Sequence, residues 1–177
     1  MENIKKNPTA PAPLHHLDLT ALAALIRAGE VSPVEVAQAQ LQRIGELDAD
    51  LRSYARVTAE SALREAETAA AEIRGGRYRG PLHGVPIALK DLFRRKGVPT
   101  AAGTILHRDT PAEHDATAVR RLREAGAVLL GQLQMSEGAY SDHHPDIDAP
   151  RNPWNADYWT GISSSGSAVA TAAGLCF

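Results

Sequence analysis

The sequence predicts an α/β fold, and three observations support that prediction. Two short apolar runs, Val85–Leu89 and Ala127–Leu130, are typical of buried strands. Between them, apolar residues recur at helical spacing until Gly126. A strand, a helix and a strand in that order indicate a parallel pair joined by a crossover helix.

The composition is that of a globular protein with a sizeable core. The 177 residues are 44% hydrophobic and 23% charged, values that argue against disorder. A net charge of −2 gives no reason to expect nucleic acid or an anionic membrane as a partner. The lone cysteine, Cys176, fits a reducing compartment. Because no secretory-type or membrane-spanning apolar run is present, we expect a cytoplasmic protein.

The N-terminal third predicts an arm followed by helices. Residues 1–13 carry three prolines and no periodicity, which predicts a flexible arm, whereas residues 14–177 are expected to form one domain. Asp18 or Thr20 can cap a first helix that ends at Gly29.

Two further helices follow before residue 75. Ser32 and Glu35 have the spacing of a capping box, and the helix that they start is expected to end near Asp48. A third helix is predicted from about Thr58 to Ile73. None of these helices carries recognisable catalytic chemistry, so we interpret them as scaffold.

The second half mixes loops with shorter elements. Gly97–Thr104 is too rich in Gly, Thr and Ala for regular structure, and Asp115 is expected to cap the crossover helix. Ser136–Tyr140 could start another helix. Leu175–Phe177 reads as the beginning of a buried strand, and since the sequence stops within it, we expect a truncated chain.

Two stretches could carry chemistry. Thr160–Val169 places three successive serines, a fourth at Ser167 and two glycines before an apolar run, so hydroxyls and free N–H groups gather at a helix N-terminus. Lys90 closes the first apolar run, where burial disfavours the ammonium form and favours a neutral amine that can act as a base. On these residues alone, an ordinary helix cap and a lysine that reaches solvent or pairs with Asp91 remain alternatives.

Together these stretches resemble the amidase signature family. Gly84–Asp91, with the sequence GVPIALKD, is similar to the lysine segment of that family, and Gly161–Ala173 is similar to its Gly/Ser-rich signature. Gly97–Thr104 resembles a third family stretch, and Asp115–Gly131 with Gln134–Glu137 resembles a fourth. The four occur in the family's order, and the resemblance runs from about Pro33 to the last residue.

The resemblance implies a fold and a site. The fold is the amidase signature fold, a mixed central sheet wrapped by helices, here truncated to its helical N-terminus and first strands. In the implied Ser–Ser–Lys triad, Lys90 is the catalytic lysine and Ser163 the bridging serine, which follows a cis peptide bond in the family. Gln134, Met135 and Ser136 are expected to line one wall of the substrate pocket.

The resemblance also implies a reaction. The family hydrolyses a linear amide to a carboxylate and ammonia through an acyl-enzyme, with no cofactor or metal. Its nucleophilic serine lies roughly two dozen residues beyond the bridging serine, so we expect it to be absent from these 177 residues and the chain alone to be inactive. The expected partner is a small-molecule amide, and a homodimer is left open. The A subunit of a tRNA-dependent amidotransferase and a non-catalytic fragment are the alternative functions.

Some residues depart from the family or suggest other sites. Ile162 and Ser165 replace glycines that usually flank the serine pair, which we interpret as subfamily variation. A phosphate-binding loop at Gly161–Ser167 is disfavoured because the Gly-Lys-Ser/Thr ending is missing. His143 and His144 lie near aspartates in one loop without the spacing of a zinc site, so we interpret them as surface histidines.

Overall fold

A three-stranded mixed sheet lies at the centre of the molecule. The computed structural model describes residues 13–177, so the predicted arm lies outside the described residues apart from Pro13. The strands are β1 (Tyr54–Val57), β2 (Pro86–Lys90) and β3 (Val128–Leu133), in the order β1-β3-β2. β2 runs parallel to β3, which confirms the predicted crossover pair, and β1 pairs with β3 antiparallel.

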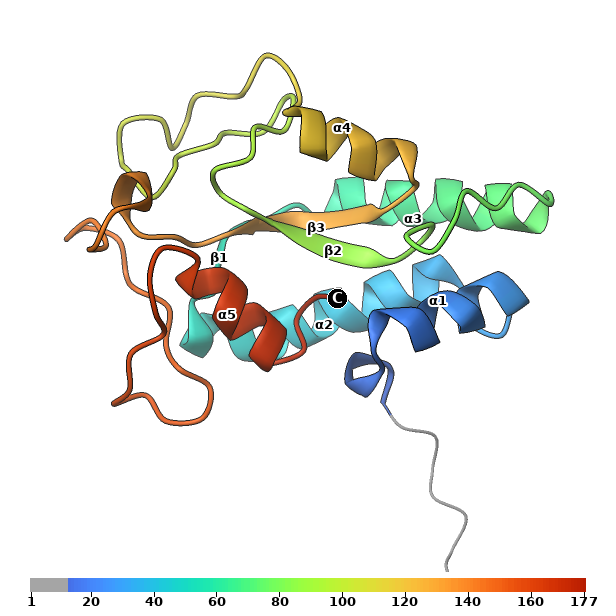
Figure 1. The fold of residues 1–177 in the computed structure, drawn as a ribbon, viewed down its shortest axis with the longest axis horizontal. Helices are drawn as coiled ribbons and strands as arrows, with labels where there is room; N and C mark the ends of the chain where they lie inside the picture. The colour runs from blue at the N-terminus through green and yellow to red at the C-terminus, as the bar shows by residue number, and fades with distance from the viewer. Residues whose placement is uncertain (1–12) are drawn as a thin grey trace, which may run out of the picture.

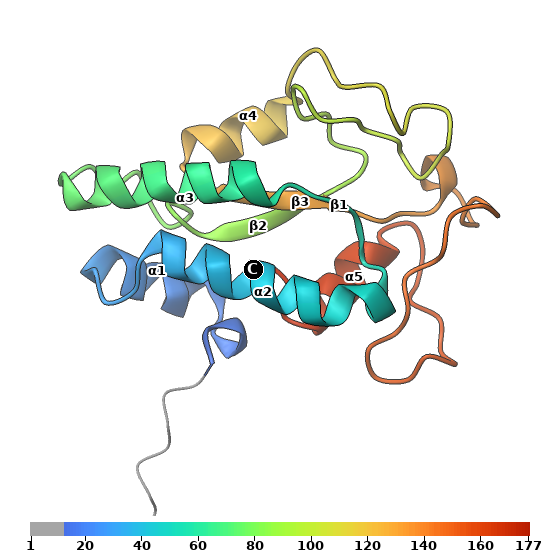
Figure 2. The same ribbon diagram turned by 180° about the vertical axis from the view of Figure 1, so that it is seen from behind.

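Helices cover the strands from two sides. Figures 1 and 2 show α1, α2 and α5 on one side of the strands and α3 and α4 on the other. The sheet therefore presents two different surfaces, and the ends of β2 and β3 point toward the loops that precede α5. The helices and 3-10 turns are η1 (Leu14–His16), α1 (Leu19–Ala28), α2 (Pro33–Leu51), α3 (Ala59–Arg74), α4 (Thr117–Glu124), η2 (Glu137–Ala139) and α5 (Ser165–Ala172).

The first two helices begin as their local sequence predicts. The Asp18 carboxylate accepts the backbone N–H of Ala21 at 2.8 Å, and α1 ends at Gly29 in the left-handed conformation. At the start of α2, Glu35 accepts the N–H of Ser32 at 2.7 Å and completes the capping box. These caps satisfy N–H groups that have no partner within the helix.

Other predicted boundaries were wrong. Asp115 does not cap α4, because its carboxylate accepts the backbone N–H of Lys96 at 2.6 Å and lies 3.4 Å from the Arg123 guanidinium. Ser136–Tyr140 forms a single 3-10 turn instead of a helix. Leu175–Phe177 is not assigned as a strand, although the N–H of Phe177 donates to the carbonyl of Pro86 in β2 at 3.1 Å.

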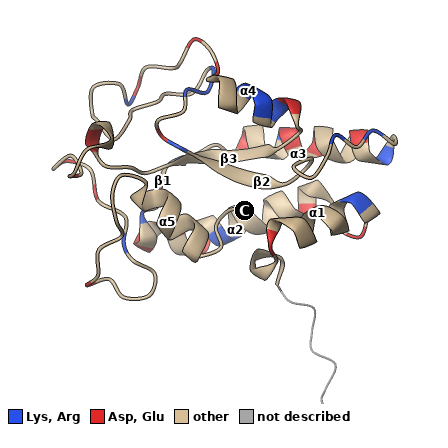
Figure 3. Cartoon of the chain, in the orientation of Figure 1, with Lys and Arg blue, Asp and Glu red and all other residues tan. Residues whose placement is uncertain are grey.

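The core is built from small and branched apolar side chains on both sides of the sheet. Alanines let α2 and α3 lie close to the strands, where they pack against β3 residues such as Leu130. Figure 3 shows charged residues along α3 and α4, whereas the sequence of α5 contains none. Within residues 13–177, no helix is both long and apolar enough to cross a bilayer.

A buried arginine ties α3 to the sheet. Arg95 is 1% exposed and donates to the hydroxyls of Thr58 and Ser61 at 2.7 and 2.9 Å. It also donates to the Leu129 carbonyl at 3.2 Å and forms an ion pair with Glu65 at 3.1 Å. Burial lowers the pKa of the Arg95 guanidinium, and the nearby Glu65 carboxylate opposes that shift.

Candidate active site

The last residue of β2 carries one half of the candidate site. Apolar neighbours in β2 pair with β3 and fix the strand, which leaves Lys90 half-buried at its C-terminal end. The Lys90 Nζ donates to the hydroxyl oxygen of Ser163 at 2.6 Å. The structure thus brings together the two residues for which the resemblance implied catalytic roles, although 73 positions separate them in the chain.

Ser163 lies in the turn that leads into α5. Its peptide bond with Ile162 is cis, and its carbonyl accepts the N–H of Ser136 at 3.2 Å. Ser164 is the N-cap of α5, but its side chain makes no capping hydrogen bond. The three serines therefore do not act as an ordinary helix cap, since the Ser163 hydroxyl is directed to Lys90 instead.

A glycine allows the first turn of α5 to sit on the end of the sheet. The N–H of Gly166 donates to the carbonyl of Gln134 at 3.0 Å. A Cβ at this position would lie 2.4 Å from the Ser53 carbonyl oxygen and 2.5 Å from that of Gln134. Only a residue without a side chain fits so close to two strand-end backbones. This contact sets the position of the turn that holds Ser163.

The three predicted pocket residues occupy different environments. Gln134 is half-buried and lines a cavity of about 170 Å³ that Asp91 and Arg56 also line. Met135 and Ser136 are fully buried, and the Ser136 hydroxyl donates to the Tyr140 carbonyl at 2.5 Å. Ser136 therefore reaches the site through its backbone N–H. A substrate-binding role for these three residues stays a prediction.

The sequence suggested Asp91, which follows Lys90, only as an alternative ion-pair partner of that lysine. It is 3% exposed, and burial raises the pKa of its carboxyl to about 6. The backbone N–H groups of Ala101, Gly103 and Ala102 oppose that rise, and the bond from Ala101 measures 3.1 Å. The signal available in the sequence was an aspartate at the end of an apolar strand, where an unpaired carboxylate is rare.

His143 was interpreted as a surface histidine, and the structure differs. Its ring is half-buried, and Nε2 lies 2.9 Å from the hydroxyl of the fully buried Ser165. Burial lowers the pKa of His143, which favours the neutral ring. Ser165 replaces a glycine of the family pattern and so adds a buried hydroxyl at this position. His143 gives that hydroxyl a hydrogen-bond partner.

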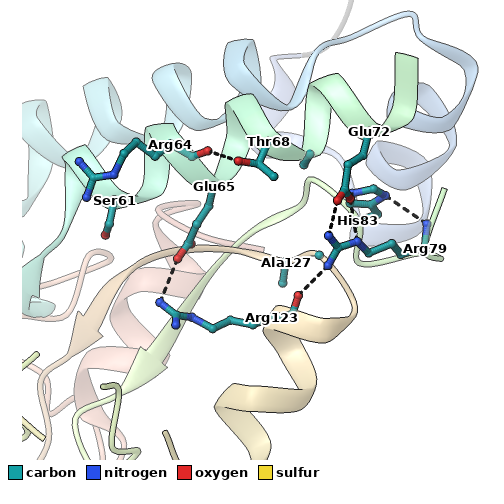
Figure 4. A pocket seen from close by; sticks show the side chains of 11 residues that line it. Ser61, Arg64, Glu65, Thr68, Glu72, Arg79, His83, Arg123 and Ala127 are labelled. Carbon is teal, nitrogen blue, oxygen red and sulfur yellow. Dashed lines mark hydrogen bonds and ion pairs between the residues drawn. The ribbon is translucent and has the colours of Figure 1, made fainter. Parts of the chain in front are cut away.

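A larger cavity lies elsewhere, between α3 and the C-terminal end of α4. It measures about 430 Å³, and neither Lys90 nor Ser163 lines it. Figure 4 shows Glu72, Arg79 and His83 at one end of this cavity and an ion pair to Glu65 at the other. These charged groups are already paired with each other; Arg79 holds Glu72 at 2.5 Å and lowers the pKa of that carboxyl.

No group of three or more His, Cys, Asp and Glu side chains among residues 13–177 is placed to hold a metal ion. His83, interpreted from the sequence as structural, is fully buried, and its Nδ1 accepts the backbone N–H of Arg79 at 3.1 Å.

Comparisons with known proteins identify the family of the chain. Residues 35–177 match the family described as Amidase. AmiD of Mycobacterium bovis, described as a putative amidase, is 53% identical over 161 residues, which cover 91% of this chain and 34% of AmiD. The A subunit of glutamyl-tRNA(Gln) amidotransferase from Chromohalobacter salexigens is 44% identical over 164 residues, which cover 92% of this chain and 34% of that protein.

Solved structures of amidases share the fold of this chain. The peptide amidase of Stenotrophomonas maltophilia matches with a TM-score of 0.85 and 39% identity, over 93% of this chain and 35% of that enzyme. The helix-covered mixed sheet is thus the N-terminal architecture of amidase signature enzymes, as predicted. The chain belongs to the amidase family. It spans about a third of the length of the relatives that it matches.

Proposed function

We propose that this chain is part of an amidase that hydrolyses a linear amide to a carboxylate and ammonia, with Lys90 and Ser163 as catalytic residues. The observation that carries the proposal is the 2.6 Å contact between Lys90 Nζ and Ser163 Oγ. An amine in direct contact with a hydroxyl can take its proton and return it, which is general acid–base catalysis. Membership of the amidase family supports hydrolysis of C–N bonds in general.

In the proposed mechanism, a proton relay activates the nucleophile. Neutral Lys90 accepts the hydroxyl proton of Ser163, and Ser163 accepts the proton of a nucleophilic serine. The oxygen of that nucleophile bonds to the amide carbonyl carbon, the C–N bond breaks, and the relay returns the proton to the departing nitrogen. Water then hydrolyses the acyl-serine ester to the carboxylate. No metal or cofactor takes part.

We further propose that the nucleophile is not among these 177 residues. The family motif puts it roughly two dozen residues after Ser163, a position beyond Phe177. The 177-residue chain should therefore release no ammonia from simple amides, because it lacks the attacking oxygen and the oxyanion-stabilising amides near it. Ammonia release that survives purification and is lost in Ser163→Ala would refute this part.

The catalytic role of Lys90 is tested in the chain extended by its natural downstream sequence. Lys90→Ala should lower the acylation rate by about 10²–10⁴-fold, the usual contribution of a general base, without changing the fold. Lys96→Ala is the matched control, because Lys96 is exposed and lies six residues further along the chain. Equal acylation rates in the two variants would remove Lys90 from the mechanism.

One observation favours a second candidate function. The 44% identity to an amidotransferase protein raises the alternative that the ammonia is transferred and not released. The loop at residues 136–153 shows no recognisable partner or ammonia-channel signature, so we favour a free-standing amidase. Ammonia release from amides by the extended chain alone supports that choice, whereas turnover only of glutamine, and only with the other amidotransferase chains added, supports the alternative. The cytoplasmic location and a homodimer stay predictions.

A further inference from the structure

Asp91 connects the end of β2 to the loop that follows it. Its backbone N–H donates to the Leu133 carbonyl of β3 at 2.9 Å, and its own carbonyl accepts the N–H of Ala102 at 3.0 Å. Its carboxylate accepts the N–H of Ala101 at 3.1 Å. A single buried residue, adjacent to Lys90, therefore binds this loop through both its backbone and its side chain.

The same loop packs against the segment that follows β3. The Ala102 carbonyl accepts the N–H of Gly138 at 2.8 Å. At Gly103, whose φ is +71°, a Cβ would lie 2.7 Å from the carbonyl oxygens of both Met135 and Ser136. The loop thus lies directly on the backbone of Ser136, with no side chain between them.

Ser136 completes a path to the other half of the site. Its backbone N–H donates to the Ser163 carbonyl at 3.2 Å. A continuous series of contacts therefore leads from Asp91 through the Ala101–Gly103 loop and Ser136 to Ser163. The path begins next to Lys90 and ends at the serine that Lys90 contacts.

We propose that Asp91 is a positioning residue for the Lys90–Ser163 pair, because its carboxylate holds the Ala101–Gly103 loop against Ser136 and thereby fixes the Ser163 backbone opposite Lys90. This role rests on the proposed function of the pair. The carboxylate suits the task because it accepts N–H bonds and is fixed by burial. Asparagine keeps an oxygen acceptor in the same place, whereas alanine keeps none.

The chain also contains a matched control residue. Asp115 likewise accepts a backbone N–H of the connection between β2 and α4, that of Lys96 at 2.6 Å. The Asp115 carboxylate also lies 3.4 Å from the Arg123 guanidinium, and neither Lys96 nor Arg123 belongs to the path to Ser163. Removing the Asp115 carboxylate should loosen the connection without affecting the Lys90–Ser163 pair.

The test uses the 177-residue protein labelled with ¹³C and ¹⁵N. Hydrogen exchange of the Ser136 N–H reports its bond to Ser163, and the ¹³Cε resonance of Lys90 reports the contact between amine and hydroxyl. A single Lys90→Arg variant assigns that resonance, because the chain has few other lysines. The four lysines are Lys5, Lys6, Lys90 and Lys96.

Asp91→Ala should raise the exchange rate of the Ser136 N–H by about tenfold or more, as expected when one charge-assisted bond is lost. It should also move the Lys90 resonance toward the value it has in Ser163→Ala. Asp91→Asn should keep both signals near wild type. Asp115→Ala should speed exchange at Lys96 only, and unchanged exchange across β3 shows that the variants remain folded.

Faster exchange at Ala101 with unchanged Ser136 exchange and an unchanged Lys90 resonance in Asp91→Ala would overturn the proposal. If that variant does not fold, Gly103→Ala perturbs the same path from the other side of the loop, and an unchanged Lys90 resonance there overturns it as well. The two proposals fail separately, because unaltered acylation in Lys90→Ala would refute the relay but leave this coupling intact.

Discussion

Replacing Arg95 with alanine is expected to destabilise the protein strongly. The side chain joins α3 to β3, because it donates to the hydroxyls of Thr58 and Ser61 at the start of α3 and to the carbonyl of Leu129 in β3. It also neutralises Glu65, whose side chain is 22% exposed. The loss of such a residue leaves polar groups in the interior without their partner and opens a cavity.

The magnitude follows from what remains after the substitution. Removing one partner of a buried ion pair costs about 3–5 kcal/mol, because the other charge stays buried without compensation. Glu65 would retain Arg123 at 3.3 Å and the N–H of Leu129 at 2.8 Å, so we expect the lower end, about 3 kcal/mol. Domains of this kind are stabilised by only about 5–15 kcal/mol in total.

Urea unfolding followed by circular dichroism measures the effect. Arg64→Ala is the matched control, because Arg64 lies on the same helix, is 61% exposed and pairs with Glu60 one turn away. An exposed pair of that kind contributes about 0.3–0.5 kcal/mol. If the two variants lose stability to within about 1 kcal/mol of each other, Arg95 is not the tie between α3 and the sheet that its contacts indicate.

Two further predictions concern the site. Gly166→Ala should destabilise the protein by about 2 kcal/mol or more, because its Cβ would lie 2.4 Å from the Ser53 carbonyl oxygen, whereas Gly45→Ala, with nothing within 4 Å, should stabilise α2 by about 0.5–1 kcal/mol. Denaturation midpoints check both, and a neutral Gly166→Ala contradicts the close contact. Asp91→Asn should be more stable than wild type by about 2–3 kcal/mol at pH 8 but equally stable at pH 3. The pKa of the Asp91 carboxyl is about 6 in the folded protein and 3.8 in the unfolded chain, so the wild-type protein loses stability as the pH rises from 3.8 to about 6 and asparagine does not. A difference between the two proteins that does not depend on pH would contradict it.

Local sequence was sufficient where an element is determined by its own residues. The capping box of Ser32 and Glu35 predicted the start of α2 because both partners lie within one helical turn. The strands β2 and β3 were predictable because each contains a short continuous apolar run, which is typical of buried parallel strands.

Prediction failed where a distant contact decides the outcome. β1 has only four residues, three of them exposed, so it lacks a periodic pattern and forms only because β3 offers it an edge. Gly131 helps, since a Cβ there would lie 2.2 Å from the Arg56 carbonyl oxygen of β1. Asp115 is a residue type that is common at helix N-caps, yet its carboxylate accepts the N–H of Lys96, 19 residues earlier in the sequence.

In the candidate site, too, local motifs were predictable and contacts between distant segments were not. The apolar run before Lys90 and the serines around Ser163 were visible as motifs, but their contact was implied by a family resemblance and not by spacing. Asp91 and His143 were missed in their present roles because each depends on a partner from another segment, Ala101 in one case and Ser165 in the other. A buried polar residue carries information only once its partner is known.

Backbone contacts, more than side-chain packing, determine where the two halves of the site meet. Lys90 is fixed by the pairing of β2 with β3. Ser163 is held by the Ser136 N–H, which donates to its carbonyl, and by the nearby hydrogen bond from the Gly166 N–H to the Gln134 carbonyl. Because backbone groups are present at every residue, most side-chain substitutions in this region should leave the geometry intact. The exceptions are the glycines whose Cβ would have no room and position 91, where a side-chain oxygen must accept the N–H of Ala101 to hold the loop.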